Sequence, residues 1–425
     1  MANNILDQLV DIAGTKSRDG SYNQLVKDAN ESLFLQNEDY HILTTAFRDQ
    51  KQADVCGDIE GYTTSYDNEG HIVPTSIQEI LARAYHYGAS DIHISSGTPP
   101  KMRLHGELLQ MPYSFLTPSK TEELLKPLLS SNQIKMFEEN GDLDFAYSLP
   151  EACRFRVNML KQKGTWAAVF RCLSNRIPLA DELGLPKVVQ ELASKKRGLV
   201  LVTGPTGSGK STTLASIIRI INETRRENII TLEDPIEYIH ENKFSTILQR
   251  EMGLDSKSFA AGIRASLRED PDVILIGEMR DPETIATAIT AAETGHLVFS
   301  TLHTIGAAPT IDRIIDSFPS SQQNQIRAQL SSTLEAVISQ QLVPNVNENG
   351  RVAAFEVMLA NNAIRSLIRE NKVPQMVSTM QTNRASGMIT MDDYLMTLYY
   401  QGTISGEKAI EFAIDKVSMK QKIGL

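Results

Sequence analysis

Four short apolar runs in the middle of the chain have the length and composition of buried β-strands. They are Leu199–Thr203, Asn228–Leu232, Asp272–Ile276 and Leu297–Thr301. Segments with helical periodicity separate these runs, and the clearest are Ser211–Thr224, Ser258–Leu267 and Pro282–Thr294. Because strands that alternate with helices usually form a parallel sheet, the pattern predicts an α/β domain over residues 186–345.

A different mixture of elements precedes this domain, over residues 76–175. Ser76 is a good helix cap, and Ile80 and Leu81 behind it fit the apolar face of a helix. Short strands are then expected at Asp91–Ser95, Lys101–His105, Glu107–Met111, Asp144–Ser148, Arg154–Leu160 and Thr165–Leu173. Two helical patterns, Pro118–Ser130 and Asn132–Glu139, lie among them. The mixture predicts a small α+β domain.

The remaining segments have weaker patterns. Residues 176–185 carry Pro178 and Gly184, which is typical of an interdomain linker. Residues 346–425 are expected to form a helical C-terminal segment. Residues 1–75 are polar, with one helical candidate at Glu38–Gln50, and we interpret them as a flexible extension.

The net charge and the cysteine content limit the partners and the cellular location that we expect for this protein. The 425 residues carry a net charge of -10, and residues 1–75 hold most of the excess, with about 13 acidic against about 5 basic side chains. This balance argues against sequence-blind nucleic-acid binding, so no nucleic-acid partner is expected. The three cysteines form no CxxC pair, and no apolar run approaches the length of a membrane span. A cytoplasmic protein is therefore expected.

A P-loop is the clearest chemical signal. It reads Gly204, Pro205, Thr206, Gly207, Ser208, Gly209, Lys210 and Ser211, with Thr212 next. An apolar strand precedes it and a helix follows, which is the context that the motif requires. The loop N–H groups are expected to bind phosphate oxygens, Lys210 to reach the β and γ phosphates, and Ser211 to ligate Mg²⁺. The segment predicts ATP or GTP binding with Mg²⁺.

Acidic residues follow two of the predicted strands. Glu278 comes after the run Asp272–Ile276, where we expect it to polarise the attacking water or hold Mg²⁺, while Asp272 itself is expected to be a cap. Glu233, Asp234 and Glu237 follow the run Asn228–Leu232 and project from the same edge of a parallel sheet. They could serve Mg²⁺, with Asp234 as the metal ligand, or water activation. Turn chemistry around the Asp-Pro pair is the alternative.

Two histidines bracket the last apolar run. His296 precedes it and His303 follows it, which places them too far apart to ligate one zinc ion. An imidazole can donate to phosphate, so His303 is a candidate sensor of the γ-phosphate and His296 a candidate nucleotide contact. A packed structural role is the alternative for either histidine.

Together these blocks resemble the secretion-ATPase superfamily, and most closely its type IV pilus retraction ATPase family (PilT). In that family's terms the blocks are Walker A at Gly204–Ser211, the Asp box at Thr231–Glu237, Walker B at Asp272–Asp281 and the His box at Gly295–Thr304. Ser90–Ser95 and Arg154–Asn158 resemble its N-terminal PAS-like domain. Ala363–Glu370 resembles a C-terminal signature associated with retraction, although its apolar stripe alone indicates only a packed helix.

The resemblance implies a RecA-like ATPase domain, a ring-shaped homo-hexamer and hydrolysis of ATP. It also implies partners in the pilus machinery, including an inner-membrane platform protein, so that the chain is peripheral to the membrane. Arginines of the N-terminal domain are expected to approach the phosphates, and Arg154, Arg156 and Arg171 are the candidates by position. Solvent-facing strand arginines are the alternative. Residues 1–75 have no counterpart in the typical family member.

Other functions remain open at this point. Extension and type II secretion ATPases share the nucleotide motifs but usually carry a paired CxxC element, and no cysteine follows Cys172 here. A conjugation ATPase is disfavoured by the C-terminal signature, and a nucleic-acid translocase by the acidic balance. A regulator that binds ATP without hydrolysing it is disfavoured because Lys210, Ser211 and Glu278 are all present.

Overall fold

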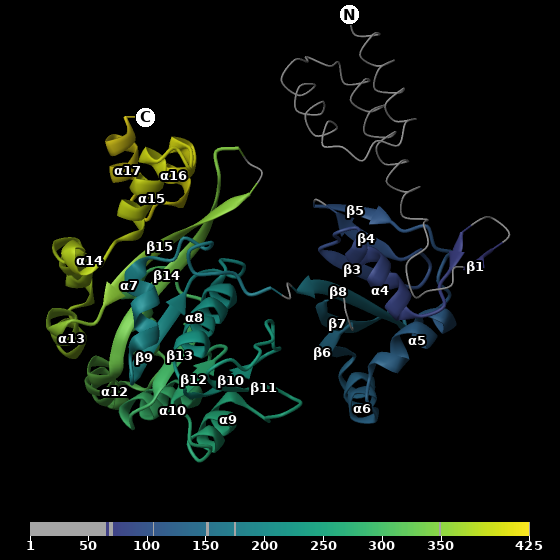
Figure 1. The fold of residues 1–425 in the computed structure, drawn as a ribbon, viewed down its shortest axis with the longest axis horizontal. Helices are drawn as coiled ribbons and strands as arrows, with labels where there is room; N and C mark the ends of the chain where they lie inside the picture. The colour runs from purple at the N-terminus through teal and green to yellow at the C-terminus, as the bar shows by residue number, and fades with distance from the viewer. Residues whose placement is uncertain are drawn as a thin grey trace, which may run out of the picture.

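A computed structural model of the chain describes residues 65–67, 71–104, 106–149, 153–173, 176–347 and 350–424. The predicted helix Glu38–Gln50 and almost all of the acidic extension lie outside the described residues. Figure 1 shows two domains, the first in purple to teal and the second in teal to yellow. Within the described residues, no helix is long and apolar enough to cross a membrane.

The first domain is built on a six-stranded antiparallel sheet with the order β5-β4-β3-β8-β7-β6. Its strands are β3 (Asp91–Ser95), β4 (Lys101–Leu104), β5 (Glu107–Gln110), β6 (Asp142–Ser148), β7 (Arg154–Gln162) and β8 (Thr165–Leu173). Three helices pack on it: α4 (Ile77–His86), α5 (Pro118–Leu125) and α6 (Ser131–Asn140). A two-stranded ribbon of β1 (Ser65–Tyr66) and β2 (Ile72–Val73) precedes them. The predicted mixture of helices and strands is present, and most of these elements begin and end close to the expected residues.

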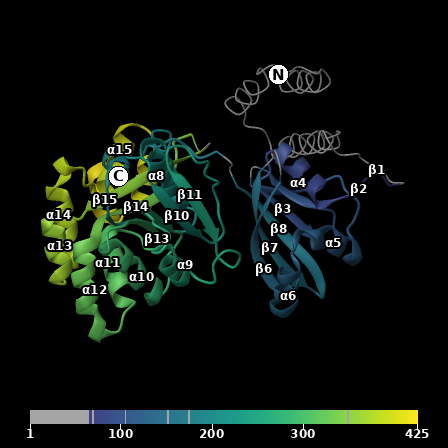
Figure 2. The same cartoon turned by 60° about the horizontal axis from the view of Figure 1, so that its bottom comes forward.

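The two faces of this sheet differ in chemistry because side chains alternate along each strand. On β7, Phe155, Val157 and Met159 are buried in the core against the helices. Arg154 and Arg156 lie on the opposite face. Figures 1 and 2 show α4 and α5 on the side of the sheet away from the second domain. The arginine-bearing face is therefore turned toward the second domain.

The second domain is a seven-stranded sheet with the order β11-β10-β12-β13-β9-β14-β15. Its strands are β9 (Gly198–Thr203), β10 (Asn228–Glu233), β11 (Thr246–Glu251), β12 (Val273–Ile276), β13 (Leu297–Leu302), β14 (Leu334–Pro344) and β15 (Arg351–Leu359). All neighbouring pairs are parallel except β14 and β15. Asp272 caps the entry to β12 by accepting a hydrogen bond from the N–H of Asn228.

Helices cover both faces of this sheet. The elements involved are α7 (Lys187–Glu191), α8 (Lys210–Thr224), α9 (Phe259–Ser266), α10 (Pro282–Glu293), α11 (Ala307–Asp316) and α12 (Ser320–Thr333). On β9, Leu199 and Leu201 join the core formed with α9 to α12, whereas Val200 and Val202 join the core formed with α7 and α8. A strand buried on both faces needs a continuous apolar run, which explains why this part of the sheet was predictable.

The sheet extends beyond its expected limits. β15 pairs antiparallel with β14, so Arg351–Leu359 is a strand of the second domain's sheet rather than part of a helical segment that starts at residue 346. β11 and β14 were also not predicted. β11 reads Thr-Ile-Leu-Gln-Arg-Glu and lacks an apolar run, because it is an edge strand with one neighbour. Ala180 and Leu185 of the expected linker pack into the core of the second domain.

Helices do dominate the chain after β15. They are α13 (Asn362–Arg369), α14 (Met376–Thr382), α15 (Met391–Tyr400), α16 (Gly406–Phe412) and α17 (Lys416–Ile423). On α13, Ile364 and Ile368 are buried as the apolar stripe predicted, but Ala363 is exposed. The helix packs on α12, and the last three helices form a small core of their own against β14 and β15.

Candidate nucleotide site

The P-loop follows β9 and leads into α8, as the sequence predicts. Gly204 and Gly209 have φ angles of 142° and 90°, which favour glycine. A Cβ at Gly204 would lie 2.2 Å from the carbonyl oxygen of Gln340, and one at Gly209 would lie 2.8 Å from Gln340 Nε2. Thr213 Oγ1 donates to Gln340 Oε1 at 2.7 Å. Gln340 of β14 therefore packs against the P-loop glycines and is hydrogen-bonded to Thr213 in the first turn of α8.

Sequence reasoning missed Gln340. It lies in β14 beside Gln341, and both side chains are buried in a mostly apolar strand. Two glutamines inside such a run are the signal that could have marked the position, because buried polar groups need hydrogen-bond partners.

The side chain of Lys210 folds back onto the backbone of the P-loop. Its Nζ donates to the carbonyl oxygens of Gly204 at 2.9 Å and Pro205 at 3.0 Å. Burial lowers the pKa of Lys210, while the negative charges of Glu237 and Glu278 oppose this shift. The structure therefore brings two of the predicted carboxylates into the electrostatic reach of the predicted phosphate-binding lysine.

The start of α8 has the properties of a phosphate site. Its N-cap is Gly209, and no side chain caps its first turn. Helix N-termini of this kind bind anions, because their N–H groups point outward along the dipole. Ser211 is exposed there, and the Thr212 hydroxyl is hydrogen-bonded to that of Tyr238 at 2.9 Å. A nucleotide phosphate fits this end of the helix.

Glu278 follows β12 and lies beside the side chains of His303 and Arg280. Its Oε2 is 3.4 Å from His303 Nε2, at the end of β13, and 2.7 Å from Arg280 Nε. Asp234 joins this group, because its pKa is raised by desolvation and then by the negative charge of Glu278. Glu278 and His303 are thus in contact at the carboxyl edge of the sheet, and Asp234 lies within electrostatic reach of Glu278. Sequence reasoning missed Arg280.

Glu233 is held differently from the other acidic candidates. Its Oε1 accepts hydrogen bonds from Thr231 Oγ1 at 2.7 Å and Gln249 Nε2 at 3.1 Å. Desolvation raises the pKa of this carboxyl group. Two donors from β10 and β11 therefore fix Glu233 in place, whereas Asp234 lies within electrostatic reach of Glu278 and Glu237 within that of Lys210.

His296 does not join the site. It lies before β13, at the amino edge of the sheet, where its Nδ1 is 2.9 Å from the carbonyl oxygen of Ala291. The six-residue strand separates it from His303 by roughly 20 Å. His296 therefore lies at the opposite edge of the sheet from the P-loop of its own subunit, and its contact with a nucleotide stays a prediction.

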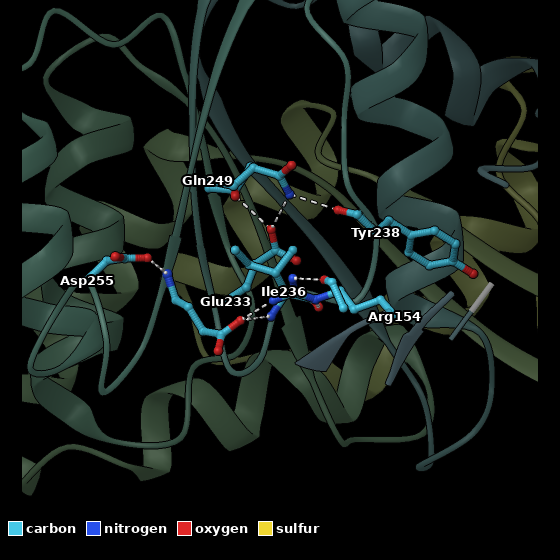
Figure 3. A network of polar contacts seen from close by, with 9 residues as sticks. Arg154, Glu233, Ile236, Tyr238, Gln249 and Asp255 are labelled. Carbon is cyan, nitrogen blue, oxygen red and sulfur yellow. Dashed lines mark hydrogen bonds and ion pairs between the residues drawn. The ribbon is translucent and has the colours of Figure 1, made fainter. Parts of the chain in front are cut away.

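The three candidate arginines have three different environments. Arg154 Nη2 donates to Glu251 Oε2 at 2.7 Å, and its Nε donates to the Ile236 carbonyl oxygen at 2.9 Å (Figure 3). Arg171 pairs with Asp91 at 2.9 Å on the neighbouring strand. Arg156 is exposed, and its positive charge opposes the raised pKa of Asp234. Of the three, Arg156 is the arginine whose charge acts on an Asp-box carboxylate.

A preformed metal cage is absent from the described residues, where no group of three or more His, Cys, Asp or Glu side chains could hold an ion. This donor set fits Mg²⁺ better than zinc, because Mg²⁺ is usually bound by one or two protein oxygens together with substrate phosphates and water. Ser211, Asp234 and Glu278 supply oxygens of that kind at one edge of the sheet.

Comparison with known proteins assigns the family. A model of the family described as type II/IV secretion system protein matches residues 66–385. The chain belongs to this family. A twitching motility protein of Neisseria gonorrhoeae is 49% identical over 320 residues, which cover 75% of this chain and 86% of that protein.

The type IV pilus retraction ATPase PilT of Pseudomonas aeruginosa is 47% identical over 337 residues, which cover 79% of this chain and 98% of that protein. Among solved structures, a pilus retraction motor PilT with bound ADP has a TM-score of 0.77 and 49% identity. The match covers 82% of this chain and 100% of that one. The family resemblance and the fold class drawn from the sequence motifs are confirmed.

Proposed function

We propose that the chain is an ATP-hydrolysing motor that retracts type IV pili. The observation that carries the proposal is the convergence of Lys210, Glu278 and His303 beside a P-loop, in a chain that closely resembles retraction ATPases. The absence of any cysteine after Cys172 supports retraction over the extension ATPases, which usually carry a CxxC pair.

In the proposed mechanism, each residue of the site has its own role in ATP hydrolysis. The P-loop N–H groups and Lys210 bind and orient the phosphates, and Ser211 and Asp234 would hold Mg²⁺, which would supply positive charge to the phosphates. Glu278 orients the attacking water, and the proposed role of His303, 3.4 Å from Glu278, is contact with the γ-phosphate. Arg156 adds positive charge next to the Asp box, which favours a transition state with charge spread over phosphate oxygens.

The proposal includes the assembly in which this chemistry does work. The motor is a homo-hexamer. It acts at the cytoplasmic face of the inner membrane, where a platform protein and other pilus components hold it. Both statements rest on the resemblance of the sequence motifs to the retraction ATPase family.

Purified protein and two lysine variants test the hydrolysis step. Lys210→Ala removes the ammonium group that binds the phosphates, so ATP turnover should fall at least about 100-fold. Lys126→Ala is the matched control, because Lys126 is exposed and pairs with Glu122 in the first domain. Phosphate release at saturating ATP is the measurement. Equal turnover in all three proteins would remove the proposed site.

A further inference from the structure

Two side chains of β11 hold the loop that carries the Asp box. Gln249 accepts a hydrogen bond from the N–H of His240 at 2.8 Å and donates to the carbonyl oxygen of Tyr238, also at 2.8 Å. Glu251 Oε2 accepts from the N–H of Ile236 at 3.1 Å. The loop backbone is therefore pinned at three points to an edge strand, with Ile236 between Asp234 and Glu237.

A third support comes from the other domain. Arg154 belongs to β7 of the N-terminal sheet, yet its guanidinium contacts both the Ile236 carbonyl oxygen and the Glu251 carboxylate (Figure 3). The ion pair is enclosed, because the side chains of Arg154 and Glu251 are only 17% and 4% exposed. Glu251 is itself fixed at its backbone N–H, which donates to Asp255 Oδ2 at 2.8 Å.

The geometry leads us to propose that Arg154 is a positioning residue that couples docking of the N-terminal domain to the placement of the Asp-box carboxylates. Arg154 and Glu251 together hold the loop at both backbone groups of one residue, since Arg154 donates to the carbonyl oxygen of Ile236 and Glu251 accepts from its N–H. Asp234 lies two residues before Ile236 and Glu237 one residue after it. Withdrawal of the N-terminal domain removes the Arg154 support and frees the loop.

This role replaces the phosphate contact expected for Arg154 from the sequence. All three nitrogens of its guanidinium already donate to protein oxygens, with Nη1 bound to Ser148 Oγ at 3.1 Å. Arg156, two residues further along the same face of β7, is exposed instead. Arg154 thus supports the Asp-box loop, whereas the positive charge of Arg156 acts on the Asp234 carboxylate.

The inference rests on the proposed ATPase activity and is tested by steady-state kinetics of the full chain. The variants are Arg154→Gln, Glu251→Gln and the double variant. Arg264→Gln is the matched control, because Arg264 forms an exposed ion pair with Glu283 at 2.8 Å. Arg154→Gln should lower kcat about 10- to 100-fold while KM for ATP stays within about twofold, because misplaced catalytic groups lose rate rather than ground-state binding.

The double variant distinguishes coupling from two independent effects. Because Arg154 and Glu251 act as one support, the double variant should be no slower than the slower single variant. Amide hydrogen exchange should rise at residues 233–240 in Arg154→Gln and stay unchanged in Arg264→Gln. The melting temperature of each variant serves as the check on folding.

Three outcomes would overturn the inference. They are wild-type kcat in Arg154→Gln, a rise in KM for ATP that accounts for its whole loss of kcat/KM, and multiplicative losses in the double variant. Wild-type protein without any ATP turnover would instead remove the proposed function. In that case hydrogen exchange at residues 233–240 still tests the contact between the domains.

Discussion

The acidic residues of the site differ in what surrounds each of them. Glu278 lies between His303 and Arg280 near the P-loop lysine, a setting that suits a group acting on water. Glu233 is held by Thr231 and Gln249, which suits a fixed structural carboxyl group. Of these two carboxylates, Glu278 is the one whose charge acts on Lys210, so the water-orienting role remains our proposal for Glu278.

His240 makes the stability of the loop depend on pH. Burial lowers the pKa of His240 to about 4. As pH falls from about 6.5 to about 4, the unfolded chain binds a proton that the folded chain does not, so stability decreases. At about pH 4.5 the loss is roughly 2–3 kcal/mol. Above about pH 6.5 both states are neutral and the effect vanishes.

The variant His240→Gln removes this effect. Urea unfolding at about pH 7 and about pH 4.5 should show a smaller loss of stability for His240→Gln than for the wild type, by roughly 2–3 kcal/mol. The N–H of residue 240 can still donate to Gln249 in the variant, since the bond involves only the backbone. Identical pH dependence in the two proteins would contradict the burial of His240.

At the scale of elements, the side chain of Arg365 joins α13 to its neighbours through several hydrogen bonds. Arg365 donates to the carbonyl oxygens of Ser331 and Ser332 in the last turn of α12, to that of Ala360, and to Glu335 Oε1. A cation at the end of a helix satisfies free carbonyl groups and complements the dipole. The helix that resembles the retraction signature is thereby joined to α12 and β14.

Arg365→Lys should loosen this junction, because an ammonium group cannot match the several directions that the guanidinium serves. We expect a loss of roughly 2 kcal/mol in unfolding free energy. Arg369→Lys is the control on the same helix, since Arg369 is exposed and bonds to Ser366 Oγ. It should change stability by less than about 0.5 kcal/mol. Thermal unfolding measures both, and equal losses would contradict the assignment.

Elements were predictable where burial leaves a local mark on the sequence. β9, β12 and β13 are buried on both faces and appear as apolar runs, so the edge that carries the P-loop, Glu278 and His303 could be placed. β11 lies at the sheet edge, and its polar side chains serve the Asp-box loop. Contacts such as Glu251 with Arg154 join segments 97 residues apart, so no local pattern encodes them.

At the scale of the whole molecule, the two domains meet at the site of chemistry. The arginine-bearing face of the N-terminal sheet is turned toward the second domain, and Arg154 reaches the Asp-box loop (Figures 2 and 3). Contacts of this polar kind allow domains to move relative to one another. In the proposed motor, such motion is the step that converts hydrolysis into force on the pilus.

Imaging of fluorescently labelled pili in living cells tests the central claim most directly. Cells that lack the gene, and cells that carry only Glu278→Gln, should extend pili that then fail to retract, so pili accumulate on the surface. Cells that carry the wild-type gene should retract them. Loss of pili in the deletion strain, or normal retraction with Glu278→Gln, would contradict the account.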